Sequence, residues 1–127
     1  MSWTVDYYEN HDGDCPIEAF LNKLSVKARA KCLAYIGLLE KKGYELPSSF
    51  IKQVRGKVWE LRPEWAGNEY RFFYVGLVGK RFFVLHAIQK KSQKLKDRDI
   101  KIAEDRYAEI LRRETDEEAP AIRQRAD

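Results

Sequence analysis

Two long apolar runs late in the chain constrain the fold more than any other part of the sequence. Residues 70–78 are YRFFYVGLV and residues 80–89 are KRFFVLHAIQ, so nearly every position of both runs is apolar or aromatic. Side chains of a β-strand alternate between two faces, and a strand that is apolar on both needs cover on both. Gly79 and Lys80 predict a tight hairpin turn between the runs. The two runs therefore predict neighbouring strands in the interior of a sheet.

Two further runs extend this sheet. Residues 57–62, KVWELR, are rich in β-forming residues and precede the apolar runs at a spacing that suits consecutive antiparallel strands. Near the N-terminus, residues 2–8 alternate and place Trp3, Val5 and Tyr7 on one face. Together these runs predict a mostly antiparallel sheet of four strands.

Helical periodicity occupies the chain between the first strand and the other three. The first helix has Pro16 at its first position and Glu18 in its first turn, where a carboxylate suits the helix dipole. Ser25 can cap a second helix, and Gly43 can end it in a left-handed conformation. The apolar stripes of the two helices are Ile17, Phe20, Leu21 and Leu24, then Ala28, Cys32, Tyr35, Ile36 and Leu39. This pattern predicts a helical hairpin packed on one face of the sheet.

A last helix is expected from residue 97 to residue 113. Its stripe consists of Ile100, Ala103, Tyr107, Ile110 and Leu111. The sequence thus predicts one α+β domain over residues 1–113, with the element order βααβββα. Residues 114–127 are acidic and poor in apolar side chains, so we expect a disordered tail there.

Positive charge is concentrated in the middle of the chain. Residues 1–48 hold six Lys/Arg and seven Asp/Glu, residues 49–101 hold thirteen and five, and residues 102–127 hold five and eight. The net charges of these blocks are therefore −1, +8 and −3, which sum to the overall +4. A field of this kind attracts polyanions, and nucleic acid is the commonest of these in the cytoplasm. The alternative is a lysine-rich surface that is merely solvated.

The composition also bears on cellular location and on metal binding. No apolar run approaches the roughly 20 residues of a membrane-spanning helix, and the first residues lack the pattern of a signal peptide. We therefore expect a cytoplasmic protein with no membrane contact. The two cysteines and two histidines lack metal-type spacing, so we expect no zinc site and no cofactor.

Two arginines flank the loop between the second and third predicted strands. Arg62 ends one strand and Arg71 begins the next, so the short loop brings them near each other. Two guanidinium groups held in this way form a fork suited to phosphate oxygens. Alternatively, Arg71 pairs with Glu60 or Glu69 and fixes the sheet.

The connection LHAIQKKSQKLKDRDIK, residues 85–101, carries a second group of cations, namely Lys90, Lys91, Lys94, Lys96 and Arg98. Lys90 and Lys91 directly follow the last strand, so we expect the sheet to fix their backbone. The alternative is a solvated loop. His86 is either a titrating base or a satisfied core histidine. Lys52, Arg55 and Lys57 form a third basic group.

Three segments resemble the RelE/ParE toxin superfamily, and the HigB-type, phage-derived branch of type II toxin–antitoxin systems is the most similar within it. These segments are VWELR, then YRFFYV, then FFVLHAIQKKSQKLKDRDIKIAEDR. The similarity covers roughly residues 1–112, and it lies in the order and spacing of the segments. It implies a RelE-like fold.

The resemblance further implies a ribosome-dependent endoribonuclease that cleaves mRNA without a metal ion. RNA supplies its own nucleophile, the 2′-hydroxyl, so the protein provides a base, an acid and a clamp for the phosphate. A lysine whose pKa is lowered by neighbouring cations is one way to supply the base. The implied catalytic residues are Arg62, Arg71, Lys90 and Lys91, and the implied RNA contacts are Lys52, Arg55, Lys57, Lys94, Lys96 and Arg98. The implied partners are mRNA on the ribosome and a helix-turn-helix antitoxin.

The sequence departs from this family at one point, and two other functions stay open. Family members often carry a tyrosine or a His-Asp pair near the C-terminus for acid–base work, and here the candidates are only Tyr107, well inside the last predicted helix, and the tail. One alternative function is a non-catalytic member of the fold that binds nucleic acid or a partner. The other is a gyrase inhibitor of the ParE type.

Overall fold

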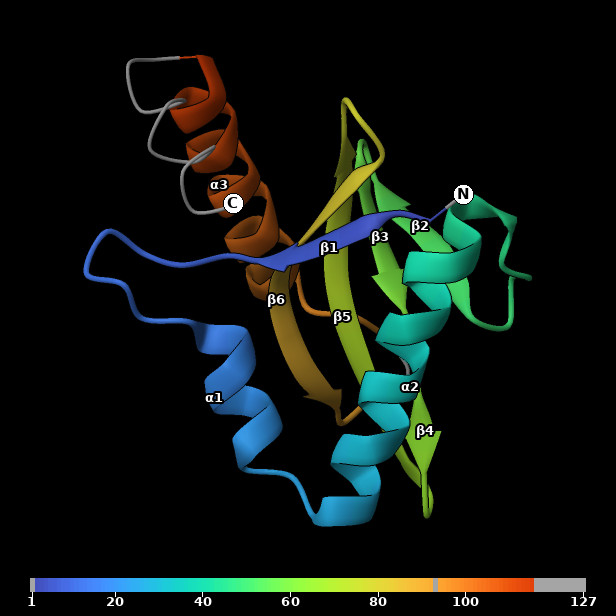
Figure 1. Cartoon of the computed structure of the whole chain (residues 1–127). Coiled ribbons are helices and arrows are strands. Elements are labelled where there is room, and N and C mark those ends of the chain that lie inside the picture. The colour runs from blue at the N-terminus through green and yellow to red at the C-terminus, as the bar shows by residue number, and fades with distance from the viewer. Residues whose placement is uncertain (1, 93, 116–127) are drawn as a thin grey trace.

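The computed structural model describes residues 2–92 and 94–115. It is an α+β structure in which one sheet has helices on both faces (Figure 1). In chain order the elements are β1 (Thr4–Tyr7), α1 (Pro16–Asn22), α2 (Val26–Lys42), the 3-10 turn η1 (Gly43–Glu45), β2 (Ile51–Arg55), β3 (Val58–Leu61), β4 (Glu64–Trp65), β5 (Asn68–Leu77), β6 (Arg81–Lys90) and α3 (Asp97–Thr115).

The sheet is larger than the sequence predicts. Its six strands run in the order β1-β6-β5-β3-β2, with β4 paired to β5, and β1 is parallel to β6 while the other pairs are antiparallel. The expected four strands and the order βααβββα were therefore wrong in detail, because β2 and β4 were missed. Strand β2 is an edge strand with three exposed positions, so it lacks an apolar alternation that would predict it. Strand β4 has only two residues beside a turn.

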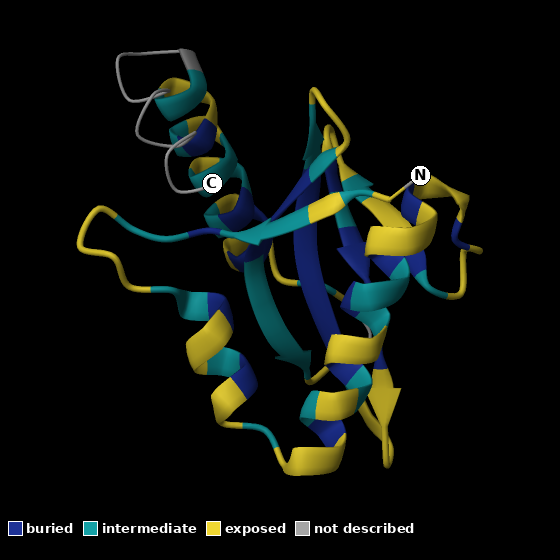
Figure 2. Ribbon diagram, in the orientation of Figure 1, coloured by how far each residue is buried: buried dark blue, intermediate teal, exposed yellow. Residues whose placement is uncertain are grey.

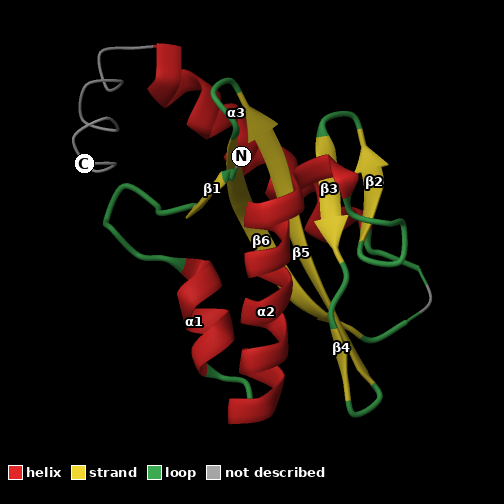
Figure 3. Cartoon of the chain, turned by 45° about the vertical axis from the view of Figure 1, so that its right-hand side comes forward, coloured by secondary structure: helices red, strands yellow, loops and turns green. Residues whose placement is uncertain are grey.

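The predicted helical hairpin is confirmed on one face of the sheet. Figure 3 shows α1 and α2 side by side along the strands. Ser25 caps α2 by accepting a 3.2 Å hydrogen bond from the Ala28 amide, and Gly43 ends it with φ of +57°. Both predicted stripes pack into one core with Leu61, Phe72 and Tyr74 of the sheet. Cys32 is fully buried in this core, as its place on the stripe predicts.

Helix α3 covers part of the opposite face. Ala103 and Ile110 are buried against Phe73 and Leu85, and Tyr107 packs at the edge of that cluster. Leu111 is 39% exposed, so its assignment to the buried stripe was wrong. The helix continues to Thr115, and the predicted acidic tail lies, from residue 116 onward, outside the described residues. Figure 2 shows dark, buried strands between the two helical layers.

An irregularity in β6 positions a residue for the site. Phe73 pairs with His86 and Tyr74 pairs with Val84, so Leu85 is one extra residue in β6. A bulge of this kind disturbs the alternation of side chains locally. Leu85 and His86 both lie on the face that α3 covers, and the His86 ring stacks on Phe73 at 5.8 Å between centroids.

Candidate nucleic-acid interface

Three strands bring the predicted cations to one end of the sheet. Leu61 pairs with Phe72, which places Arg62, directly after β3, beside Arg71 on β5. On the next strand Lys90 pairs with Glu69, at the start of β5. The proximity of Arg62 and Arg71 that the sequence predicts is therefore present, and the last residue of β6 lies at the same end. These cations lie on the face of the sheet that α3 packs against, at the end of the sheet that α3 does not cover.

Glu60 lies between the two arginines. Its Oε2 is 3.4 Å from Arg62 Nε, and its Oε1 is 3.6 Å from Arg71 Nε. Glu60 is 4% exposed and Arg71 is 1% exposed, so this carboxylate and one guanidinium are removed from water. Charges are stable at such a depth only when they are paired. Glu60 therefore holds the two guanidinium groups in place.

The burial of Arg71 changes the role that the sequence suggests for it. Its Nη2 donates to Glu69 Oε1 at 2.7 Å, and its Nη1 donates to the Tyr70 carbonyl at 2.8 Å. Arg71 thus pairs with both Glu60 and Glu69, as the alternative interpretation of the sequence expects. Arg62 keeps 30% of its side chain exposed, and its Nη1 donates to the Ser48 carbonyl at 3.3 Å. Arg62 is the guanidinium presented at the surface, and Arg71 supports it through Glu60.

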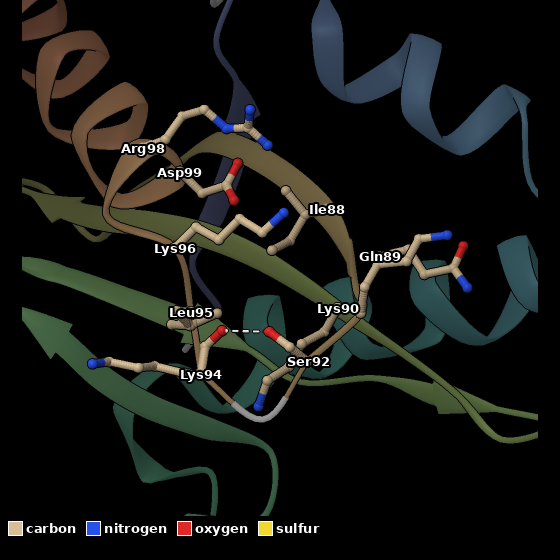
Figure 4. Close-up of a pocket in the computed structure, with 10 residues that line it drawn as sticks. Ile88, Gln89, Lys90, Ser92, Lys94, Leu95, Lys96, Arg98 and Asp99 are labelled. Atoms are coloured by element: carbon tan, nitrogen blue, oxygen red, sulfur yellow. Dashed lines mark hydrogen bonds between the residues drawn. The ribbon is translucent and has the colours of Figure 1, made fainter.

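A pocket of about 280 Å³ lies where β6 leads into α3 (Figure 4). Lys90 is the last residue of β6, whereas Lys91 lies beyond the strand and is exposed. The lining comprises Ile88, Gln89, Lys90, Lys91, Ser92, Lys94, Leu95, Lys96, Arg98 and Asp99. The connection is shaped by a 2.9 Å hydrogen bond from Ser92 Oγ to the Lys94 carbonyl. The expectation that the sheet fixes both lysines therefore holds for Lys90 and is wrong for Lys91.

The cations of this pocket are not neutralised by nearby acids. Five of the lining residues are lysine or arginine, and none of these five forms an ion pair with a residue that the structure describes. Among the described lining residues, Asp99 alone carries a carboxylate. Unpaired like charges around a concave surface focus a positive potential there. The pocket is thus suited to phosphate groups.

Asp99 is engaged by His86 and was not identified from the sequence. His86 Nε2 and Asp99 Oδ1 are 2.9 Å apart, with side chains 15% and 11% exposed. Burial lowers the pKa of His86, and the hydrogen bond to Asp99 opposes that effect only in part. The ring is therefore neutral at neutral pH and donates its Nε2 proton to the carboxylate. This contact fixes the first turn of α3 to β6, and it therefore anchors the α3 end of the connection that carries the cations.

The three residues of the third predicted basic group lie at different places in the structure. Lys52 pairs with Glu60 across β2 and β3, so it lies on the α3 side of the sheet and is exposed near Arg62. Arg55 is bound by α3, with Nη2 3.1 Å from Glu104 Oε1 and Nη1 3.8 Å from Asp97 Oδ1. Lys57 is in the turn between β2 and β3, at the other end of those strands. Only Lys52 joins the cations at the site.

Residues 2–92 and 94–115 contain no group of three or more His, Cys, Asp or Glu side chains that is arranged to hold a metal ion. In the same part of the chain, none of the helices combines the length and the apolar character needed to cross a membrane.

A sheet with helices on both faces and a cationic pocket at one end defines a small α+β protein with a candidate site for nucleic acid. Comparison with known families gives a more specific classification. Residues 19–108 match the family described as phage derived protein Gp49-like (DUF891). The match covers 90 of the 127 residues and includes the whole pocket, and the chain belongs to this family. None of the curated proteins matches the chain.

Proposed function

We propose that the chain is the toxin of a type II toxin–antitoxin system and acts as a ribosome-dependent endoribonuclease on mRNA. Membership of the Gp49-like family, which is related to RelE/HigB-like toxins, supports the toxin part of this proposal. The observation that carries the nuclease part is the convergence of Arg62, Lys90 and the cations of residues 91–98 at one end of the sheet.

The proposed reaction needs little beyond positioned charges. The 2′-hydroxyl of one nucleotide loses its proton as its oxygen attacks the adjacent phosphorus, the bond to the 5′-oxygen breaks, that oxygen takes up a proton, and a 2′,3′-cyclic phosphate remains. Negative charge develops on the phosphate oxygens during the attack. Hydrogen-bond donors aimed at such charge typically contribute about 3–4 kcal/mol each to the barrier. In this proposal Arg62 and Lys90 supply these donors, and the lysines of the connection hold the RNA backbone.

Residues behind this surface have supporting roles in the proposal. Arg71 is too deeply buried to touch RNA, and it positions Arg62 through Glu60. His86 does not line the pocket, and it acts through Asp99, which does. Tyr107, on α3, packs at the edge of the core and does not line the pocket. None of these three residues is therefore the proton acceptor for the 2′-hydroxyl in this proposal.

Cleavage of mRNA on programmed ribosomes tests this function. We expect the purified chain to cut mRNA inside codons and to leave 2′,3′-cyclic phosphate ends. We expect Arg62→Ala to reduce the single-turnover rate by about 100-fold or more, while Arg55→Ala, whose guanidinium is already paired with Glu104, changes it little. Binding to ribosomes without any cleavage by the parent chain would contradict the nuclease proposal.

A second candidate function is nucleic-acid binding without catalysis. It is favoured by the burial of Arg71, which leaves Arg62 as the one exposed arginine of the predicted fork. In that case Arg62→Ala weakens ribosome binding and no RNA ends are formed. The proposed partner in both cases is an antitoxin with a helix-turn-helix domain, and its co-expression is expected to relieve growth arrest. Induced DNA damage on expression would instead indicate a gyrase inhibitor.

A further inference from the structure

A second pocket, of about 510 Å³, lies at the other end of β5 and β6. Its lining comes from the residue before β1, the end of α2, η1 and the turn between β5 and β6, and it consists of Trp3, Lys41, Lys42, Tyr44, Glu45 and Lys80. The ten residues of β6 separate it from the cationic pocket, a distance of roughly 30 Å along a strand. The proposed nuclease site uses none of its residues.

Aromatic side chains form a rigid wall in this pocket. The Trp3 ring stacks on Phe82 with 4.3 Å between centroids and 15° between planes, and Tyr44 meets Trp3 edge-on at 5.6 Å. Tyr44 also packs on Trp59, at 5.3 Å. Although it is held by these contacts, Tyr44 remains 43% exposed. The protein therefore presents a fixed aromatic surface to solvent.

Two glycines make room for this wall. A Cβ on Gly43 would lie 2.3 Å from Trp3 Nε1, and a Cβ on Gly76 would lie 2.4 Å from the Tyr44 hydroxyl oxygen. Both distances are far below van der Waals contact, so a larger residue at either position displaces a ring. The two glycines thus allow both aromatic rings to pack directly against the backbone.

Three lysines surround the aromatic surface. Lys41, Lys42 and Lys80 form no ion pair with a residue in the described part of the chain, and Glu45 contributes the single carboxylate of the lining. Lys80 has φ of +57°, a left-handed conformation that is uncommon for a residue with a side chain. Gly79 beside it has φ of +88°, and the tight turn between β5 and β6 needs positive φ at both positions, so the hairpin fixes the backbone of Lys80. The lining therefore has a net charge of +2 beside an exposed ring.

We propose that this pocket binds a nucleoside phosphate. The ammonium groups would receive the phosphate, and the exposed ring surface of Tyr44 would pack against the base, since stacking on an aromatic side chain typically contributes about 1–3 kcal/mol per base. The volume falls within the range of about 300–1,000 Å³ that is common for small-ligand sites. The nucleoside phosphate is either a free mononucleotide or an unpaired nucleotide of RNA. The two pockets share no lining residue, so binding here does not require nuclease activity at the other end of the sheet.

Titration of the full-length chain, followed by the indole N–H signal of Trp3 in NMR spectra, tests this site. The three tryptophan signals are assigned with single Trp→Phe variants. We expect adenosine monophosphate to shift the Trp3 signal saturably, and adenosine or inorganic phosphate alone to bind at least tenfold more weakly. No shift with the mononucleotide or with RNA, or an equal response to inorganic phosphate, would overturn the proposal.

Two double variants test whether the mononucleotide binds at these lysines. Lys41→Gln/Lys42→Gln is expected to weaken mononucleotide binding at least tenfold. The matched control, Lys23→Gln/Lys27→Gln, removes the same charge from exposed positions near the start of α2 and is expected to leave binding unchanged. Equal weakening by both pairs would overturn the site.

A single-stranded hexanucleotide distinguishes the two sources of the ligand. A shift of the Trp3 signal at lower concentration than with the mononucleotide, and its loss in Lys41→Gln/Lys42→Gln, identifies an RNA nucleotide. Binding of the mononucleotide without any response to the hexanucleotide identifies a free nucleotide.

Discussion

Arg71 and Glu60 form a pair whose burial decides what either residue can do. Arg71 is 1% exposed and contacts Glu60 and Glu69, while Glu60 forms its other ion pair with Arg62. Removing one partner of a buried pair leaves the other charge uncompensated, which typically costs about 3–5 kcal/mol. We therefore expect Arg71→Ala to lower the free energy of unfolding by about that amount in urea titrations.

Arg55→Ala is the matched control for this change, because it also removes one arginine from carboxylate partners. Arg55 pairs with Glu104 and Asp97 at the surface, with 48% of its side chain exposed. Water screens such pairs, so the loss of stability is expected to be much smaller. Equal losses in the two variants would mean that the buried pair contributes no more than an exposed one.

His86 gives the protein a predictable dependence of stability on pH. Burial lowers its pKa in the folded chain below the ordinary 6.5, so the unfolded chain binds the proton more readily. The contribution to stability is complete above 6.5 and is lost as pH falls from 6.5 through the lower pKa of the folded state. We expect the midpoint of thermal unfolding to fall over that range and His86→Gln to flatten the slope. His11→Gln, at the exposed second histidine, is expected to leave the slope as it is.

At the scale of single elements, the end of β6 separates two kinds of lysine. Lys90 is half-buried and its backbone pairs with Glu69 in the sheet, whereas Lys94 and Lys96 are exposed in the connection to α3. A fixed ammonium group can act on one phosphate, and mobile ones contribute mostly to attraction. We expect Lys90→Gln to slow single-turnover cleavage by about 100-fold with modest loss of ribosome binding.

The comparison variants for this prediction are Lys91→Gln and Lys94→Gln/Lys96→Gln. Both remove charge beyond the strand, so each is expected to weaken binding more than cleavage, and lower salt is expected to restore it. If Lys90→Gln affects binding alone, as the loop variants do, the whole connection attracts RNA electrostatically and the catalytic group lies elsewhere.

Local sequence patterns predict some of the elements, but they do not predict contacts that depend on how the elements pack. The runs at 70–78 and 80–89 have strong β-propensity on both faces, so β5, β6 and the hairpin between them follow from the pattern. The adjacency of Arg62 and Arg71 follows from the same strand order. The contact of His86 with Asp99 does not, because it needs both the bulge at Leu85 and the position of α3 on the sheet. The burial of Arg71 likewise depends on packing around it.

Across the whole molecule, the cations separate into those held in ion pairs and those without one. Arg55, Arg71, Arg81 and Arg113 form ion pairs with Glu104, Glu69, Glu114 and Glu109 respectively. The unpaired cations near the site are Lys52, Lys90, Lys91, Lys94, Lys96 and Arg98, six in all among the described residues. Six of the thirteen Lys/Arg of residues 49–101 therefore lie unpaired at this end of the sheet, whereas Lys57 and Lys80 lie at the other end.

This separation predicts how binding to single-stranded RNA depends on salt. Each phosphate that is neutralised on a single strand contributes about −0.7 to the slope of log K against log salt concentration, so contacts by all six cations give a slope of about −4. Lys94→Gln/Lys96→Gln is expected to reduce the magnitude of the slope by about 1.4. Arg55→Gln is expected to leave it unchanged, because that guanidinium already pairs with Glu104. The binding constant is measured by fluorescence anisotropy between roughly 50 and 200 mM salt, a range over which such contacts change affinity strongly. A slope near zero, or one that Arg55→Gln changes as much as the loop variants, would remove the electrostatic basis for placing RNA at this end of the sheet.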